Sequence, residues 1–207
     1  MTIIKMFIAG AWIEGSLKQK QPIINPANEE VISYLTLADE VDLKKALNSA
    51  EIGLCEWKSI VPWERGTIMK NAADLLRERK GKISSIMTGE HGKTLQESEI
   101  EIIRAADFIE WGGEEARRLS SRLFSARDEG SRVMIEKSPI GVVAAFTPWN
   151  YPVLQPSKKL GALLAAGCSC ILKPAEETPA STNALLQCFL DAGLPANVIN
   201  LVYGEPS

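Results

Sequence analysis

The sequence has few residues of the types that build metal sites or disulfide frameworks. Among 207 residues there is one histidine, His91, and there are four cysteines, at positions 55, 168, 170 and 188. A single histidine cannot form a histidine-based metal cluster, and the cysteines contain no tandem C-x-x-C pairs. We therefore expect no metal site and a reducing, cytoplasmic location. His91 falls in a loop that ends a helix, and we expect it at the surface rather than in catalysis.

Long apolar runs and a large charge of either sign are also missing. No apolar run is long enough to span a bilayer, and the first residues, MTIIKMFIAG, lack the layout of a signal peptide. The formal net charge is −3, which argues against a nucleic-acid surface. We expect neither a membrane nor a nucleic acid among the partners. With 45% hydrophobic residues, the chain can bury one sizeable core, or a core plus an appendage.

The G-x-G-x-x-G fingerprint of many dinucleotide-binding folds is missing, yet a βαβ pattern is present. Val142–Phe146 is a continuous apolar run, which predicts a strand buried on both faces. A polar knuckle at residues 147–150 ends this strand, because Pro148 has no N–H to extend a ladder. A helical pattern then runs from Val153 to Leu164 and is closed by Gly167.

The same pattern repeats further along the chain. Cys168–Leu172 predicts a second buried strand, residues 178–180 cap and open a second helix that Gly193 ends, and Val198–Tyr203 predicts a third strand. This is βαβαβ, the mononucleotide-binding half of a doubly wound sheet, whose ligands bind at the carboxyl ends of the strands. Lys173 would place a cation there, and Glu176 can accept from two adjacent hydroxyls, as a ribose presents.

The N-terminal part predicts strands, then helices. Two hairpins, one turning at Gly10 and one at Asn25-Pro26, are interpreted as a small exposed sheet without a site. Apolar periodicity predicts helices over 39–57, 62–82, 83–87 and 97–119, the last of them loosened by Gly112-Gly113. Arg132–Lys137 alternates between apolar and polar residues, which predicts an exposed edge strand.

Several motifs together resemble the aldehyde dehydrogenase superfamily. They are Thr147-Pro148-Trp149-Asn150 with Tyr151-Pro152, Gly161–Gly167, Lys173-Pro174-Ala175-Glu176 and Thr178-Pro179. Glu90–Lys93 and Glu114–Arg118 extend the resemblance more loosely, and the latter is similar to the succinate-semialdehyde branch.

The resemblance implies an α/β fold, the first half of an aldehyde dehydrogenase-type Rossmann-like cofactor domain (βαβαβ) preceded by an N-terminal β-hairpin and helical region. Residues 1–121 would form strands and helices that pack on the cofactor domain. Residues 122–139 would form the strand region of an oligomerisation arm, and residues 140–207 the first βαβαβ half. The catalytic domain of the family would be absent from this chain.

In the family, a cysteine thiolate attacks an aldehyde, hydride leaves for NAD or NADP, and water hydrolyses the thioester. The resemblance implies that the Asn150 side chain steadies the oxyanion and that Lys159 supports it. It implies cofactor contacts at Thr147, Pro148, Trp149, Asn150, Lys173, Ala175, Glu176 and Gly204. A carboxylate at Glu176 favours hydroxyls over a 2′-phosphate, so NAD is expected, while Lys173 leaves NADP open.

The helix after the asparagine lines the aldehyde tunnel in the family, which implies substrate contacts from Tyr151, Gln155 and Lys158. At the position of Lys158 the succinate-semialdehyde branch has an arginine that receives the substrate's carboxylate. Lysine keeps the charge and loses the two-pronged fork. We expect a small aldehyde with an anionic far end, with succinate semialdehyde as the leading candidate. The alternative is that Lys158 only solvates its helix.

The nucleophilic cysteine and the general-base glutamate of the family would lie beyond residue 207. The four cysteines present fall in predicted strands or helices, where burial makes a thiol inert.

The expected function is the N-terminal, cofactor-binding part of an NAD(P)-dependent aldehyde dehydrogenase, inactive as this chain alone. The resemblance also implies a dimer or tetramer formed through 122–139. A non-catalytic homologue acting as an assembly or nucleotide-binding module is the alternative, while the motifs disfavour an acyl-phosphate reductase.

Overall fold

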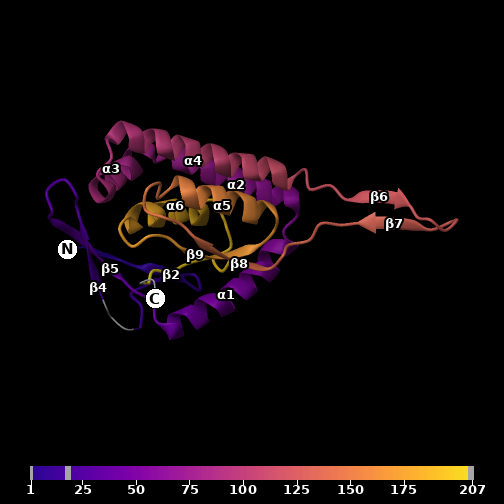
Figure 1. Ribbon diagram of the computed structural model, residues 1–207, viewed down its shortest axis with the longest axis horizontal. Coiled ribbons are helices and arrows are strands. Elements are labelled where there is room, and N and C mark those ends of the chain that lie inside the picture. Colours follow the sequence, from indigo (N-terminus) through magenta and orange to yellow (C-terminus); the bar gives the residue numbers. More distant parts are fainter. Residues whose placement is uncertain (1, 17–19, 205–207) are drawn as a thin grey trace.

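The computed structural model describes residues 2–16 and 20–204. Residues 1 and 17–19 of the predicted region 1–121 and residues 205–207 of the predicted region 140–207 therefore lie outside it. Within those ranges no helix is long and apolar enough to cross a membrane. Figure 1 shows the elements, which are β1 (Thr2–Ile4), β2 (Met6–Ile8), β3 (Ala11–Ile13), β4 (Lys20–Ile24), β5 (Val31–Thr36), α1 (Glu40–Ser59), α2 (Pro62–Glu78), α3 (Lys80–His91), α4 (Leu95–Ala116), β6 (Arg122–Ser125), β7 (Arg132–Ile135), β8 (Val142–Phe146), α5 (Leu154–Ala165), β9 (Ser169–Lys173), α6 (Pro179–Asp191) and β10 (Ile199–Leu201).

A five-stranded sheet forms the centre, in the order β3-β2-β10-β9-β8. The strands β8, β9 and β10 run parallel and are joined by α5 and α6, which confirms the predicted βαβαβ unit. Helix α1 covers one face of the sheet, while α5 and α6 lie on the other face, with α2 and α4 beyond them (Figure 1). The carboxyl ends of β8 and β9 meet because Phe146 pairs with Lys173.

The first hairpin belongs to the central sheet, so its interpretation as part of a small exposed sheet was wrong. Ala9 and Gly10 both have positive φ, as a tight two-residue turn between β2 and β3 requires. Strand β2 is apolar and fully buried, and it pairs antiparallel with β10 through Phe7 and Leu201. The second predicted hairpin, β4 and β5, forms a separate sheet with β1.

Strand β8 is not buried on both faces as its apolar run predicts. Ala144 is exposed and the Phe146 side chain is 66% exposed, while Ala145 is buried. Among the described residues, β8 pairs only with β9 and therefore forms an edge of the sheet. An apolar, unpaired edge is a surface that another segment can cover.

The N-terminal helices cap both crossover helices of the sheet. The Glu101 carboxylate of α4 accepts from the backbone N–H groups of Val153 (2.9 Å) and Leu154 (3.1 Å), which begin α5. The Glu90 carboxylate of α3 accepts from the N–H groups of Ala180 and Ser181 at the start of α6. Thr178 occupies the N-cap position of α6, but its side chain makes no capping bond, so the predicted cap was wrong. Two carboxylates thus satisfy backbone donors that would otherwise lack partners.

We expect the Glu90 cap to make stability depend on pH. Burial raises the pKa of Glu90 from 4.5 to about 7, although hydrogen bonds from Ser181 and Ala180 act to lower it. A folded-state pKa above the unfolded value means that this group's contribution is fully present below pH 4.5 and is lost as pH rises through 7. Relative to Glu90→Gln, the wild-type free energy of unfolding should fall by roughly 3 kcal/mol between pH 4.5 and 8.

Urea unfolding of both proteins at several pH values measures this difference. Glu90→Gln keeps the size and an acceptor oxygen of the side chain and cannot ionise. Stability curves of the two proteins that run parallel across this pH range would contradict the account of Glu90.

Gly112 and Gly113 do not loosen α4, which is continuous from Leu95 to Ala116. A Cβ at Gly112 would lie 2.4 Å from the carbonyl oxygen of Gly161 on α5, and one at Gly113 would lie 2.9 Å from that of Gly66 on α2. The glycine pair therefore lets α4 pack against both neighbouring helices at backbone distance.

The β6–β7 hairpin projects from the body of the protein (Figure 1). Every residue of both strands is exposed, which confirms the exposed strand predicted from the alternation of residues. Its exposed large apolar side chains are Leu123, Phe124, Val133, Met134 and Ile135.

Candidate functional site

The polar knuckle after β8 lies where the sequence predicts, at the carboxyl edge of the parallel strands. The Thr147 N–H donates to the carbonyl of Lys173 over 3.1 Å, which ties the ends of β8 and β9 together. Asn150 is exposed, and its side-chain amide makes no hydrogen bond within the described part of the chain. This amide is therefore available to a ligand.

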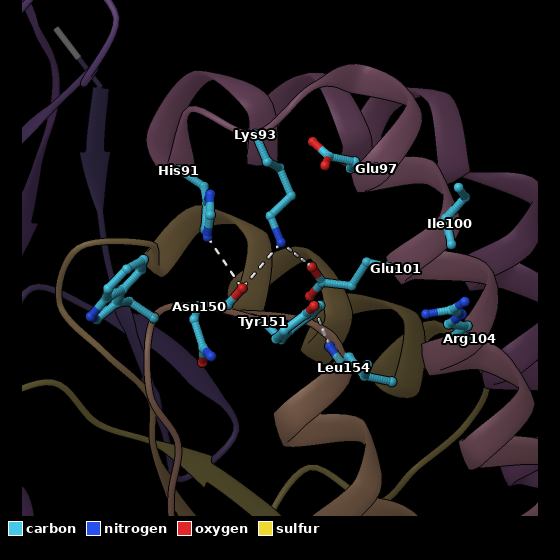
Figure 2. A pocket seen from close by; sticks show the side chains of 10 residues that line it. His91, Lys93, Glu97, Ile100, Glu101, Arg104, Asn150, Tyr151 and Leu154 are labelled. Atoms are coloured by element: carbon cyan, nitrogen blue, oxygen red, sulfur yellow. Dashed lines mark hydrogen bonds and ion pairs between the residues drawn. The ribbon is translucent and has the colours of Figure 1, made fainter.

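The backbone of Asn150 is held by two side chains from the end of α3 and the loop after it. His91 Nε2 lies 3.2 Å and Lys93 Nζ 3.1 Å from the Asn150 carbonyl oxygen (Figure 2). A carbonyl only accepts, so Nε2 carries the proton, and Nδ1 is buried without a partner in residues 2–16 and 20–204. Burial first, and Lys93 second, lower the pKa of His91. Sequence reasoning missed this contact when it placed His91 at the surface.

Lys93 connects the knuckle to the core. Its ammonium pairs with the buried Glu101 carboxylate and lies 4.6 Å from the ring centroid of Tyr151. Since Glu101 also caps α5, one ion pair fixes α4, α5 and the knuckle relative to one another. The Glu90–Lys93 motif is the only sequence signal that pointed to the loop that carries His91 and Lys93.

A hollow of about 420 Å³ opens beside Asn150 (Figure 2). It lies between the knuckle, the start of α5 and the exposed side of α4. Its lining is His91, Lys93, Glu97, Ile100, Glu101, Arg104, Trp149, Asn150, Tyr151 and Leu154. The hollow thus contains three of the predicted site residues, Trp149, Asn150 and Tyr151.

The other residues predicted to contact substrate lie further along α5. Lys158 lines a second hollow, of about 300 Å³, between α4 and α5, where its ammonium lies 5.0 Å from the ring centroid of Phe108. Gln155 is half-buried on the same helix and lines neither hollow. Lys159 is exposed and makes no hydrogen bond to Asn150 within the described residues.

Three of the residues predicted to hold the cofactor, Lys173, Glu176 and Gly204, contact one another at the ends of β9 and β10. Lys173 Nζ lies 2.6 Å from Glu176 Oε1, which also accepts from the Gly204 N–H over 3.1 Å. Glu176 Oε2 accepts no hydrogen bond from the described residues. A cation beside an uncommitted carboxylate oxygen fits the two adjacent hydroxyls of a nucleotide ribose.

Two further observations support this fit. The Thr147 hydroxyl is buried and has no partner among the described residues. Trp149 and Glu176 also line a common hollow, of about 370 Å³. Next to them Pro148 is exposed and Ala175 is buried. The predicted cofactor residues therefore gather at one edge of the sheet.

The cysteines lie away from these hollows. Cys168, Cys170 and Cys188 are buried. Burial raises the pKa of Cys170 to about 12 and that of Cys188 to about 11, as expected for packing residues. Cys55 is exposed on α1, so its predicted burial was wrong.

Comparison with known sequences points to one family. The aldehyde dehydrogenase family profile matches residues 12–207. The chain is 41% identical over 203 residues to 4-(hydroxymethyl)benzenesulfonate dehydrogenase TsaD1 of Comamonas testosteroni, covering 98% of this chain. It is 38% identical over 201 residues to succinate semialdehyde dehydrogenase of Acinetobacter baylyi, covering 97% of this chain. The chain spans 42% of the length of each of these relatives.

Comparison with solved structures points to the same family. An NADP-dependent enzyme of Escherichia coli superposes with a TM-score of 0.97 at 35% identity, over 100% of this chain and 43% of its own. Succinate-semialdehyde dehydrogenase from Burkholderia pseudomallei superposes with a TM-score of 0.95 at 34% identity, over 98% of this chain and 42% of its own. The fold is therefore that of the N-terminal part of these enzymes.

Proposed function

Because this chain belongs to the aldehyde dehydrogenase family, we propose that it is the N-terminal, cofactor-binding part of an NAD(P)-dependent enzyme that oxidises a small aldehyde to the acid. The observation that carries the proposal is the free amide of Asn150 at the same sheet edge as the Lys173–Glu176 pair. The Asn150 amide can stabilise negative charge on a substrate oxygen, and the Lys173–Glu176 pair can bind a nucleotide.

Each residue of the proposed site acts through its own chemistry. When bound, the nicotinamide cofactor supplies the acceptor for the aldehyde's hydride. Glu176 and Lys173 bind the ribose hydroxyls, with Thr147, Pro148, Trp149, Ala175 and Gly204 around the same cleft. The Asn150 amide donates to the substrate oxygen as negative charge develops there. Held through its backbone by His91 and Lys93, Asn150 needs little reorganisation to do so.

The proposed substrate is a small aldehyde with an anionic far end. The named relatives support this class, since a benzenesulfonate, succinate semialdehyde and, in a Pseudomonas putida relative at 37% identity, glutarate semialdehyde all carry an acidic group. Lys158 and Tyr151 present a cation and an aromatic ring from α5 and the knuckle. Succinate semialdehyde is the leading candidate.

We also propose an organisation for the protein. Residues 1–121 pack on the cofactor unit, residues 122–139 form an arm, and residues 140–207 form the first βαβαβ half. Because the arm exposes five large apolar side chains, it is the proposed contact of a homodimer or homotetramer.

The free thiols support a reducing, cytoplasmic location. With three of the four thiols buried, the 207-residue chain is proposed to be inactive without the remainder of the enzyme.

The cofactor assignment is tested in the enzyme that contains this chain, by following NADH or NADPH formation with succinate semialdehyde. Glu176→Ala removes the carboxylate proposed to bind the ribose hydroxyls. The apparent KM for NAD should rise tenfold or more, as expected for a lost charged hydrogen bond, and the KM for NADP should rise less. Lys173→Ala should weaken binding of both cofactors.

Glu51→Ala is the matched control, because Glu51 is an exposed carboxylate on α1. An equal loss for NAD and NADP in Glu176→Ala counts against the ribose assignment. The absence of aldehyde-dependent reduction of either cofactor in the wild-type enzyme counts against the proposed function itself.

A further inference from the structure

Arg104 on α4 lines the hollow beside Asn150 and is a cation without a protein partner among the described residues. Arg104 is exposed and makes no ion pair or side-chain hydrogen bond within residues 2–16 and 20–204. The other charged side chains of the lining, apart from Arg104, have hydrogen-bond or ion-pair partners in the protein. Lys93 pairs with Glu101, and Glu97 accepts from the backbone and hydroxyl of Thr94. The guanidinium is therefore the group here that can take an external anion.

Arg104 and Asn150 lie at different places along this hollow. Figure 2 shows Asn150 below His91 and Lys93, and Arg104 on the far side next to Leu154. In this view the Tyr151 ring and Leu154 lie between them, together with the Lys93–Glu101 pair, and Ile100 lies above Arg104 on α4. A short ligand with a polar reacting end and a charged far end matches this order of amide, aromatic ring and cation.

We propose that Arg104 is a specificity-determining residue that binds the carboxylate or sulfonate at the far end of the substrate. This inference rests on the proposed function, and it assigns the anion contact to α4 rather than to Lys158 on α5. Lys158 lies over Phe108 in the neighbouring hollow, outside the lining shared by Asn150 and Tyr151. An arginine also offers two parallel N–H donors to a carboxylate or sulfonate, which orients the ligand as well as attracting it.

The test uses the enzyme that contains this chain and compares kcat/KM for succinate semialdehyde with that for butanal. Arg104→Ala should lower kcat/KM for the anionic aldehyde tenfold or more and leave that for butanal within about twofold. Arg104→Lys should restore part of the loss, because it keeps the charge without the fork. Lys45→Ala removes an equal charge from an exposed position of α1, on the opposite face of the sheet, and should change neither value of kcat/KM.

An equal loss for both aldehydes, or no loss for the anionic one, overturns the assignment. So does a selective loss in Lys158→Ala that Arg104→Ala does not show. Because Arg104 is exposed, the melting temperature of Arg104→Ala should match that of the wild type, which separates a binding defect from misfolding. If the wild-type enzyme oxidises neither aldehyde, the proposed function fails as well, whereas turnover without an Arg104 effect removes only this inference.

Discussion

Gly112→Ala is expected to destabilise the protein by at least about 2 kcal/mol, the cost of forcing extra atoms into a closely packed contact. The added Cβ would lie 2.4 Å from the Gly161 carbonyl oxygen and 2.9 Å from its Cα, so two helix backbones must separate. Alanine's higher helix propensity, worth up to about 1 kcal/mol, offsets only part of this cost. Because α5 begins at Leu154, close to the knuckle, a shift of α5 would also disturb the site.

Gly89→Ala is the matched control. Gly89 also lies within a helix, α3, and a Cβ there would meet no atom of the described residues within 4 Å. This change should therefore leave stability unaltered or raise it by about 0.5–1 kcal/mol through helix propensity. The midpoints of urea unfolding of the two variants and the wild type measure both effects. Equal midpoints for Gly112→Ala and Gly89→Ala would contradict the close α4–α5 packing.

The parallel part of the sheet was predictable because its signals are local. Short apolar runs separated by helical patterns, with Gly167 and Gly193 after the helices, define βαβαβ without knowledge of distant contacts. Parallel strands bring their carboxyl ends to one edge, so Asn150 and Lys173 could be placed near each other before their contacts were known. The hydrogen bond from the Thr147 N–H to the Lys173 carbonyl confirms that the ends of these two strands meet.

The contacts that hold the knuckle were not predictable, because their partners are far apart in sequence. His91 and Lys93 precede Asn150 by 59 and 57 positions. Glu90 caps a helix whose first free N–H groups lie 90 positions later. A lone histidine or glutamate in a helical pattern carries no periodic signal for such a role. Only the loose family resemblance of Glu90–Lys93 pointed to this segment.

Packing environments misled the interpretation in two places. A continuous apolar run predicts burial but does not say which segment covers it, and β8 exposes Ala144 and Phe146 because it is an edge of the described sheet. Judged by helix propensity alone, a glycine pair inside a helix predicts a less stable helix. In α4, Gly112 and Gly113 instead allow two close helix contacts, which only the folded arrangement shows.

The central claim is that Asn150 carries the oxyanion contact of an aldehyde-oxidising site. Asn150→Ala removes the free side-chain amide and leaves the backbone carbonyl that His91 and Lys93 bind, so the knuckle should keep its conformation. Loss of one such donor typically lowers kcat by about 10²- to 10³-fold. Asn48→Ala, the same change at an exposed position of α1, should have no effect on the rate.

The decisive measurement is kcat for succinate semialdehyde oxidation by the enzyme that contains this chain, as wild type, Asn150→Ala and Asn48→Ala, with NADH or NADPH formation as the readout. The account predicts turnover by the wild type and by Asn48→Ala, and a kcat lower by about two to three orders of magnitude in Asn150→Ala. A kcat for Asn150→Ala within about threefold of the wild type would contradict it.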